Sequence, residues 1–532
     1  MKKVSLKYSQ LSKHITFLQK RLWVVLIVSC SMLFSCHKFL NVDALDSLSG
    51  NNFWATEQDV EDYTIGIYAQ FRKAILTNYL ICTATDWRAG YWEPYNGAPG
   101  GARNFISLIA SNNVPAIIRP GAVFAGSNST YWGYPDMLPN AWEAFYKMIA
   151  ASNILISKVD DVPDTKFSEA SRKKYKAEAV YLRSLAYFYL IRLFGDVPYY
   201  TDAYHSEALA KSDQVFILQQ CAKDLEGVAG DLPWSYTDPA NVAVRAMRGG
   251  ALITVMEMNM WMAGFDEANK TAYWKTTDSL GNILINQNQG NYELLPIDKY
   301  PVIFRGKSKE GLVELSRNAN YNEGGYGFDG RNYDISGYAT KSPPGNPTGF
   351  SFMFINSDFM EKLYPPAEPD RRKDLWFPSS FIYSGNKDFE FYKYYDFSQA
   401  GNGAYPRGSV VIYRYADAFL LRAEALADLG DESQAADMLN VVRARAGAKL
   451  YTNSDDQDIE DAIWQERVKE FMGEGSYFWD LVRTKKVLDG KYCLHPIGVE
   501  AFKEGAWTWP IPDVAKNFNP KLSLDSYWTN LQ

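Results

Sequence analysis

The sequence predicts a mostly α-helical fold in which helix pairs alternate with loop-rich inserts. Three observations lead to this class: long helical-period segments free of Gly and Pro, capping signals at their ends, and strand-like runs that are few and short. The 532 residues are 47% hydrophobic and 15% aromatic, which is enough for one large core or two closely packed ones.

The clearest helix lies between residues 168 and 198. A Ser-Glu pair opens it, Gly195 and Pro198 close it, and the stretch AEAVYLRSLAYFYLIRLF contains no helix breaker. Its apolar residues cover almost the whole circumference, so we expect other elements to pack on it from several sides. Arg183 and Arg192 interrupt this apolar surface, and we expect them to pair structurally rather than act in catalysis.

Further helices are expected at about 57–74, 138–158, 215–230, 243–263, 272–286, 413–430, 431–447 and 459–488. They group into helical regions at about 55–76, 138–286 and 413–489, and pairs of this size resemble tetratricopeptide (TPR) units. The stretches 83–134 and 290–408 are rich in Gly, Pro, Asn and aromatic residues, so we expect irregular loops there, with a few short strands in the second. The C-terminal WTWPIPDVAKNFNPKL is expected to be extended.

The N-terminus has the pattern of a secretory signal. Six basic residues and no acidic one precede the apolar run LWVVLIVSCSMLFSC, which is too short to span a bilayer and ends in LFSC, similar to a bacterial lipobox. Residues 1–35 are thus expected to be a signal peptide, with cleavage before Cys36, acylation of that thiol and a body of residues 36–532. The alternative is a signal anchor or a buried helix.

Charge and rare residue types exclude several classes of function. Without residues 1–35 the body has 49 Lys and Arg against 62 Asp and Glu, a net charge of −13 that disfavours nucleic acid. Cys82, Cys221 and Cys493 form no CxxC pair, histidine is scarce, and no phosphate-binding loop is present. We therefore expect no cofactor and no His- or Cys-based metal site, although a calcium ion held by scattered loop oxygens would leave no such pattern.

Aromatic residues in the loops are the candidate ligand contacts, because the chain has more aromatic residues than its core should require and some of them lie beside hydrogen-bonding groups. The loop at 86–95 combines both kinds of side chain. The contacts expected from it are Asp86, Trp87, Arg88, Tyr91 and Trp92. Two further clusters supply Tyr131 and Trp132, and Tyr321, Asn322 and Tyr326. The alternative in each case is that these aromatic rings fill the interior of the scaffold.

Glu466, Glu470 and Glu474 follow one another at i, i+4 and i+8, which suggests paired carboxylates for acid–base catalysis. Arginines lie on the same helix and on the segments 414–445, so an ion network between packed helices is the structural alternative, and we favour it. No catalytic residue is therefore expected.

Four stretches, taken together and in chain order, resemble the SusD/RagB family of Bacteroidetes lipoproteins: AEAVYLRSLAYFYLIRLFGDVPYY, RYADAFLLRAEALADLG with LNVVRARAG, ERVKEFMGEGSYFWDLVR, and the terminal WPIP. The Cys36 anchor followed by FLNVD resembles the family as well. The resemblance implies a TPR-like scaffold that is lipid-anchored in the outer membrane, at the cell surface, and forms a lid on a SusC-like TonB-dependent transporter.

The same resemblance implies binding of an oligosaccharide nutrient without catalysis. Two alternatives stay open: a peptide-binding lid of the RagB type, and a secreted α-helical glycosidase or lyase, which would need two carboxylates about 5–10 Å apart across a cleft.

Overall fold

The computed structural model describes residues 53–76, 84–88, 90–98, 100–118, 134–317, 353–378, 382–385, 387–394, 408–452, 454 and 457–531. These residues are mostly helical, as the sequence predicts. Contacts divide the chain into two compact units, residues 1–55 and residues 56–532, and every described helix and strand lies in the second.

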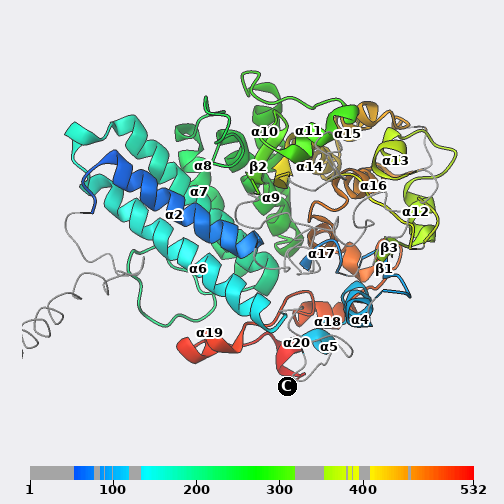
Figure 1. The fold of residues 1–532 in the computed structure, drawn as a ribbon, viewed down its shortest axis with the longest axis horizontal. Coiled ribbons are helices and arrows are strands. Elements are labelled where there is room, and N and C mark those ends of the chain that lie inside the picture. The colour runs from blue at the N-terminus through cyan, green and yellow to red at the C-terminus, as the bar shows by residue number, and fades with distance from the viewer. Residues whose placement is uncertain are drawn as a thin grey trace, which may run out of the picture. The chain divides into compact units, whose positions relative to one another are not determined.

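The central helix is α7 (Glu169–Phe194), and it begins and ends where the sequence predicts. The Ser168 side chain accepts a hydrogen bond from the backbone N–H of Ser171 at 3.0 Å, and Gly195 caps the other end with a φ of 71°. The helix is buried along most of its length. It packs against α2 (Glu57–Leu76), α6 (Tyr134–Lys158) and α8 (Gln214–Val228), which surround it in Figure 1. The prediction of a helix covered from several sides is confirmed.

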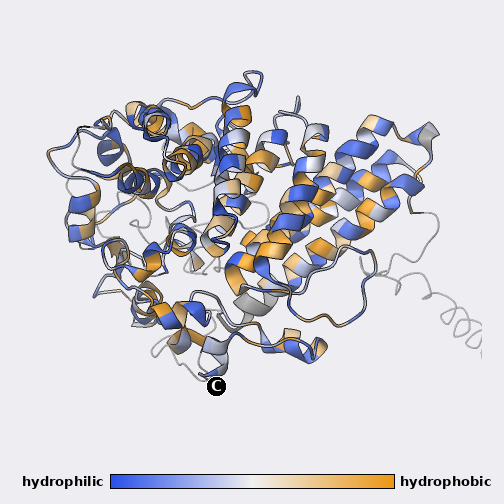
Figure 2. Cartoon of the chain, turned by 180° about the vertical axis from the view of Figure 1, so that it is seen from behind, coloured by the Kyte–Doolittle hydropathy of each residue, from blue (hydrophilic) through white to orange (hydrophobic). Residues whose placement is uncertain are grey.

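The array continues through α9 (Arg248–Phe265), α10 (Lys270–Asn286), α14 (Tyr415–Asp428), α15 (Glu432–Ala446) and α16 (Ile459–Phe471). Each of these helices packs on the one before it, and α9 packs on α8. Figure 2 shows hydrophobic and hydrophilic residues as separate stripes on many of the long helices, the pattern expected when one face is buried. The TPR-like helical scaffold is therefore confirmed.

The last long helix predicted, 459–488, is wrong as a single element. It is broken into α16 and α17 (Tyr477–Arg483), with the 3-10 turn η9 (Lys486–Leu488) beyond them. Between the two helices, Gly473 and Gly475 have φ values of 81° and 87°, which a continuous right-handed helix does not allow.

The first loop-rich stretch, 83–134, also departs from the prediction. It contains α4 (Gly100–Ala110), α5 (Val114–Ile118) and the strand β1 (Trp92–Pro94). The apolar side chains of FISLIA fold it, since Phe105, Ile106 and Ile109 are fully buried. Glycine and asparagine on both sides hide this short helical pattern in the sequence.

The second loop-rich stretch has the few strands that were expected, within its described part. Its elements are α11 (Tyr300–Arg305), β2 (Gly311–Leu315), β3 (Met353–Ile355), α12 (Ser357–Leu363) and α13 (Arg371–Trp376). Two antiparallel two-stranded sheets result: β1 pairs with β3, and β2 pairs with β4 (Val410–Arg414).

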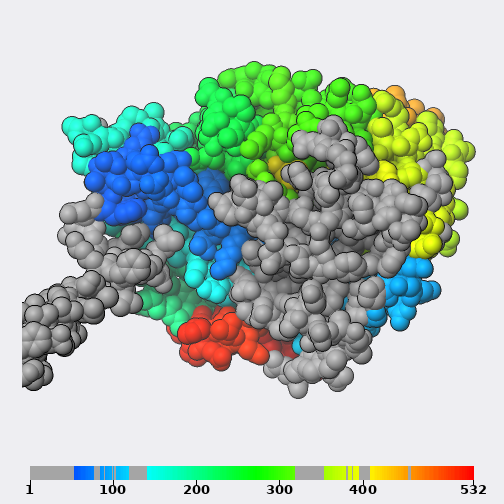
Figure 3. Space-filling model, viewed as in Figure 1, coloured from blue at the N-terminus to red at the C-terminus, as the bar shows by residue number. Residues whose placement is uncertain are grey.

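The C-terminal stretch WTWPIPDVAKNFNPKL, expected to be extended, contains the short helix α19 (Asp513–Phe518). The short helices α18 (Val499–Lys503) and α20 (Ser526–Thr529) lie before and after this stretch. Figure 3 shows part of this segment, in red, on the surface of the molecule. The remaining described 3-10 turns are η2 (Val159–Asp161), η3 (Asp164–Lys166), η4 (Ala229–Asp231) and η5 (Ile297–Lys299).

Within the described ranges, no helix has the length and apolar character needed to cross a bilayer. In the same ranges, no group of three His, Cys, Asp or Glu side chains is placed to hold a metal ion. Cys221 and Cys493 are both buried.

Candidate functional site

The loop at 86–95 is packed into the interior. Its five predicted contact residues, Asp86, Trp87, Arg88, Tyr91 and Trp92, are each no more than 2% exposed. The rings of Trp87, Tyr91 and Trp92 offer no face to solvent. These positions therefore do not form the exposed aromatic platform that was expected. The alternative of rings that fill the scaffold explains their positions.

Long-range contacts hold this loop. Tyr91 stacks on Phe359, with ring centroids 4.5 Å apart, and Trp92 pairs with Ile355 in the sheet of β1 and β3. Both partners come from a part of the chain more than 260 residues away, so local sequence gives no sign of them.

The two charged residues of the loop also serve the packing. The Asp86 carboxylate accepts the backbone N–H of Gly475 at 2.6 Å and that of Gly473 at 3.3 Å, which ties the loop to the break between α16 and α17. Burial raises the pKa of Asp86 to about 7, against the opposing effect of these two N–H donors. Arg88 donates to the carbonyl oxygen of Ala506 at 2.8 Å and lies 4.3 Å from the ring centroid of Phe478.

The other predicted contacts lie outside the described residues. These are Tyr131, Trp132, Tyr321, Asn322 and Tyr326, together with the lipidation site Cys36.

The acidic residues Glu466, Glu470 and Glu474 form the ion network that we favoured from the sequence. Glu466 and Glu470 meet Arg372 at 2.7 and 2.9 Å, and Glu474 meets Arg414 at 2.7 Å. All three carboxylates are almost completely buried. They hold α16 and the turn after it to α13 and β4, so the structural interpretation is confirmed.

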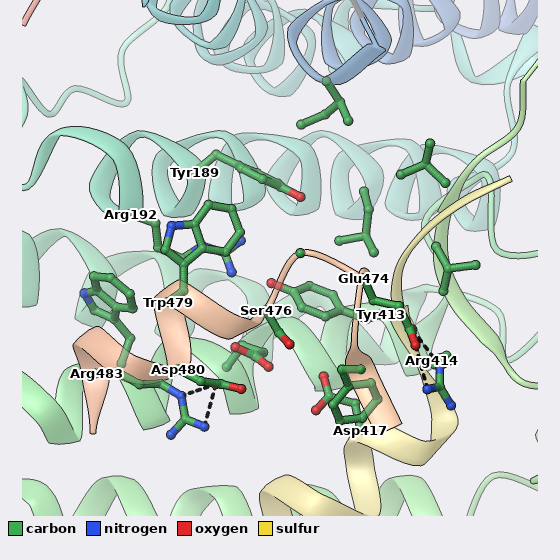
Figure 4. A pocket seen from close by; sticks show the side chains of 18 residues that line it. Tyr189, Arg192, Tyr413, Arg414, Asp417, Glu474, Ser476, Trp479, Asp480 and Arg483 are labelled. Atoms are coloured by element: carbon green, nitrogen blue, oxygen red, sulfur yellow. Dashed lines mark hydrogen bonds and ion pairs between the residues drawn. The ribbon is translucent and has the colours of Figure 1, made fainter. Parts of the chain in front are cut away.

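A small cavity lies beside this network, between α7, α9, α17 and β4. Figure 4 shows its lining, which includes Arg192, Tyr413, Glu474, Trp479 and Asp480. Its volume is about 40 Å³, whereas pockets for organic ligands measure about 300–1,000 Å³. The cavity is therefore too small for a sugar.

Two carboxyl groups of this cavity share one environment. Burial, then the neighbouring Asp417, raises the pKa of Glu257 to about 8, and burial also raises the pKa of Asp417. Asp417 accepts a hydrogen bond from Arg467 at 2.7 Å. These shifts favour a protonated carboxyl group in the pair, in a cavity too small to admit a glycan.

A larger groove of about 520 Å³ lies between α6, the segment 198–209 and α19. Its lining includes the aromatic residues Trp142, Tyr146, Tyr200 and Phe518. The Tyr200 ring stacks on His205 at 4.5 Å, and Phe518 is 86% exposed. We did not predict this groove from the sequence, and its only local signal is the run PYYTDAYH after α7.

A third pocket, of about 250 Å³, brings carboxylates and indoles together. Glu424, Asp428 and Glu460 line it beside Trp274 and Trp464. Burial, then Glu424 and Glu460, raises the pKa of Asp428 to about 7. Glu424 also has a partner outside this group of carboxylates, since it accepts a hydrogen bond from Arg483 at 2.8 Å.

Comparison with known proteins agrees with this helical architecture. The family described as "SusD family" matches residues 384–528, and the one described as "Starch-binding associating with outer membrane" matches residues 72–252. A SusD-like protein of Formosa agariphila is 24% identical, over 94% of this chain and 97% of its own.

Solved structures extend the comparison to the fold. A laminarin-binding SusD-like protein aligns with a TM-score of 0.64 at 20% identity, over 89% of this chain and 99% of its own. A SusD homologue from Bacteroides thetaiotaomicron aligns with a TM-score of 0.79 and 35% identity, over 90% of this chain and all of its own. At that identity over that coverage, the chain belongs to the SusD family.

Proposed function

We propose that this protein captures an oligosaccharide at the cell surface and delivers it to a SusC-like TonB-dependent transporter, without catalysis. Membership of the SusD family carries the proposal. The matched description "Starch-binding associating with outer membrane" and the laminarin-binding protein of the same fold support a glycan as the ligand.

The groove between α6 and α19 supports this function among the described surfaces. Its volume of about 520 Å³ falls in the range of organic ligand pockets, and its aromatic lining suits the apolar face of a sugar ring. Glu143, Lys147 and Asn519 lie at the same groove and can bond to hydroxyl groups. We propose this groove as one contact surface for the glycan. The loop residues Tyr131, Trp132, Tyr321, Asn322 and Tyr326 are proposed as further contacts.

Alanine variants separate the two surfaces. Loss of one stacking ring should weaken glycan binding by about 1–3 kcal/mol, measured by isothermal titration calorimetry. Trp132→Ala and Tyr326→Ala report on the loops, and Phe518→Ala reports on the groove. Phe216→Ala is the control, because this ring is 46% exposed on α8 and does not line the groove. Unchanged affinity in all three test variants would exclude both surfaces.

We also propose that residues 1–35 are removed and that a lipid on Cys36 anchors residues 36–532 as one SusD-like domain. Cys36→Ala should then shift the protein from the membrane fraction to the soluble fraction of fractionated cells. Retention of the variant in the membrane would contradict the lipid anchor.

A glycosidase remains the second candidate, because of the pocket at Asp428. A carboxyl group with a pKa near 7 beside other carboxylates and two indoles is an arrangement that acid–base catalysis uses. If the protein is an enzyme, Asp428→Asn should abolish release of products from a bound glycan. If it only binds, wild type and variant should leave the glycan intact.

A further inference from the structure

Arg192, in the last turn of α7, is a buried cation that forms no ion pair among the described residues. It is 4% exposed, and its Cζ lies 3.9 Å from the Trp479 ring centroid and 4.0 Å from that of Phe188. Aromatic faces attract the charge but replace neither a carboxylate nor a hydrogen-bond acceptor. No described carboxylate pairs with Arg192, and no described acceptor meets its Nε and Nη2.

A second donor lines the same small cavity. The Tyr413 hydroxyl is buried and likewise has no hydrogen-bond partner among the described residues. In Figure 4 the Tyr413 ring points toward Trp479 and Arg192. Burial raises the pKa of this tyrosine, and Arg192 counts among the charges that act on it in the opposite direction. Two hydrogen-bond donors from different elements therefore share one cavity.

The carboxylates of the cavity are engaged elsewhere. Asp480 is 3.0 Å from Arg467 and 2.7 Å from Arg483, and Asp417 is 2.7 Å from Arg467. Glu474 is bound by Arg414 at 2.7 Å. None of these carboxylates lies within ion-pair distance of Arg192.

Glu257 is the remaining acid of the lining. Burial and the neighbouring Asp417 favour its protonated, neutral form at neutral pH. Arg467 is its nearest cation, at 3.8 Å. With Glu257 neutral, Arg192 has no direct carboxylate partner within the described residues.

We propose that this cavity binds a small monovalent anion of the size of chloride, held by Arg192 and Tyr413. A volume of about 40 Å³ exceeds the roughly 10–15 Å³ that one water molecule needs, and it excludes an acidic sugar. A water molecule would satisfy the donors but leave the guanidinium group without a direct counter-ion. The anion joins the end of α7 to β4 and α17, and so couples the central helix to the C-terminal half of the scaffold.

Anion binding should weaken as Glu257 ionises, because the lining of the cavity then gains a further negative charge. The charged and titratable groups around Glu257 are Asp417 on α14, Arg467 on α16, Asp480 and Arg483 on α17, and Tyr189 and Tyr413 on α7 and β4. Affinity should therefore be higher at pH 6.5 than at pH 9.5.

Thermal unfolding of the purified protein tests the proposal. At constant ionic strength, replacing gluconate by chloride at about 100 times its Kd should raise Tm by about 2–3 °C at pH 6.5, and by less at pH 9.5. Crystals soaked in bromide should show an anomalous peak between Arg192 and Tyr413.

Tyr413→Phe keeps the ring and removes one donor, so it should lower chloride affinity at least fivefold. The matched control is Tyr477→Phe, a buried tyrosine whose hydroxyl donates to the carbonyl oxygen of Tyr492 at 3.2 Å, and it should keep the chloride effect. Equal Tm values in both salts, with no bromide peak, would overturn the proposal and would indicate that ordered water meets the donors of the cavity. A chloride effect that survives Tyr413→Phe unchanged would equally overturn it.

Discussion

Glu470 is a buried carboxylate whose surroundings indicate a structural role and not a catalytic one. Burial raises the pKa of Glu470, but Arg445, Arg414 and Arg372 outweigh burial and hold that pKa well below its usual value of 4.5. A carboxylate that stays ionised among three guanidinium groups cannot serve as a general acid at neutral pH. Its role is to hold α16 to β4, α13 and α15.

The stabilisation by Glu470 should depend on pH. Since its folded pKa lies below its unfolded pKa, the ionised group stabilises the fold above about pH 4.5, and this contribution is lost as the pH falls further. Glu470→Gln should lower the free energy of unfolding at pH 7 by about 3–5 kcal/mol and flatten the acid limb of Tm against pH. The control is Glu500→Gln, whose side chain is 82% exposed. Calorimetry at a series of pH values measures Tm. If Tm falls with acid as steeply in Glu470→Gln as in wild type, this account is contradicted.

Trp92 is a second residue whose burial decides the effect of its substitution, which should be a loss of stability. Trp92 is 1% exposed and packs against Phe389 and Phe391, so Trp92→Ala should cost about 3–5 kcal/mol of stability. Trp92→Phe keeps more of the packing and should cost less. Thermal unfolding measures both. An unchanged Tm for Trp92→Ala, together with lost glycan binding, would restore the exposed platform predicted from the sequence.

At the level of elements, the contact between α9 and α17 depends on one glycine. A Cβ atom at Gly264 would lie 2.1 Å from the backbone carbonyl oxygen of Arg483, closer than any real contact. Gly264→Ala should therefore force the two helices apart and lower Tm by about 1–3 °C.

Gly66, in α2, is the matched control for this substitution. A Cβ atom there meets nothing within 4 Å, so Gly66→Ala should leave Tm unchanged or raise it, because alanine favours the helix by about 0.5–1 kcal/mol. If both variants unfold at the same temperature as wild type, the close approach of α9 and α17 does not limit stability.

Elements with their own end signals are the ones that the sequence predicts well. The helix α7 has a serine cap, a capping glycine and no internal breaker. The helix α15 is capped by Asp431, whose side chain accepts the N–H of Gln434 at 3.1 Å. The prediction fails between Phe471 and Tyr477, where hydrophobic period alone does not reveal the positive φ values of two glycines.

The candidate site was harder to predict than the scaffold. The aromatic composition of 86–95 fits a sugar platform and a buried plug equally well. The choice between them depends on Phe359 and on β3, which lie far along the chain. The groove at Tyr200 and Phe518 likewise joins residues more than 300 positions apart, so no local sequence pattern predicts it.

At the level of the whole molecule, the buried ion network and the aromatic groove lie on different elements of the scaffold. Buried ion pairs tie α13, β4, α15 and α16 together, while the groove of about 520 Å³ lies at the other side of α7, against α6 and α19. This division suits a protein that presents an aromatic surface to a ligand, with its buried ion pairs used for structure.

The most direct test is calorimetric titration of the protein with a panel of plant, host and microbial oligosaccharides and of peptides, with analysis of the products. We expect at least one oligosaccharide to bind with measurable affinity and to be recovered at its original chain length. Shortened products would contradict capture without catalysis and favour the pocket at Asp428 as an active site. Binding of peptides alone would contradict the oligosaccharide as ligand.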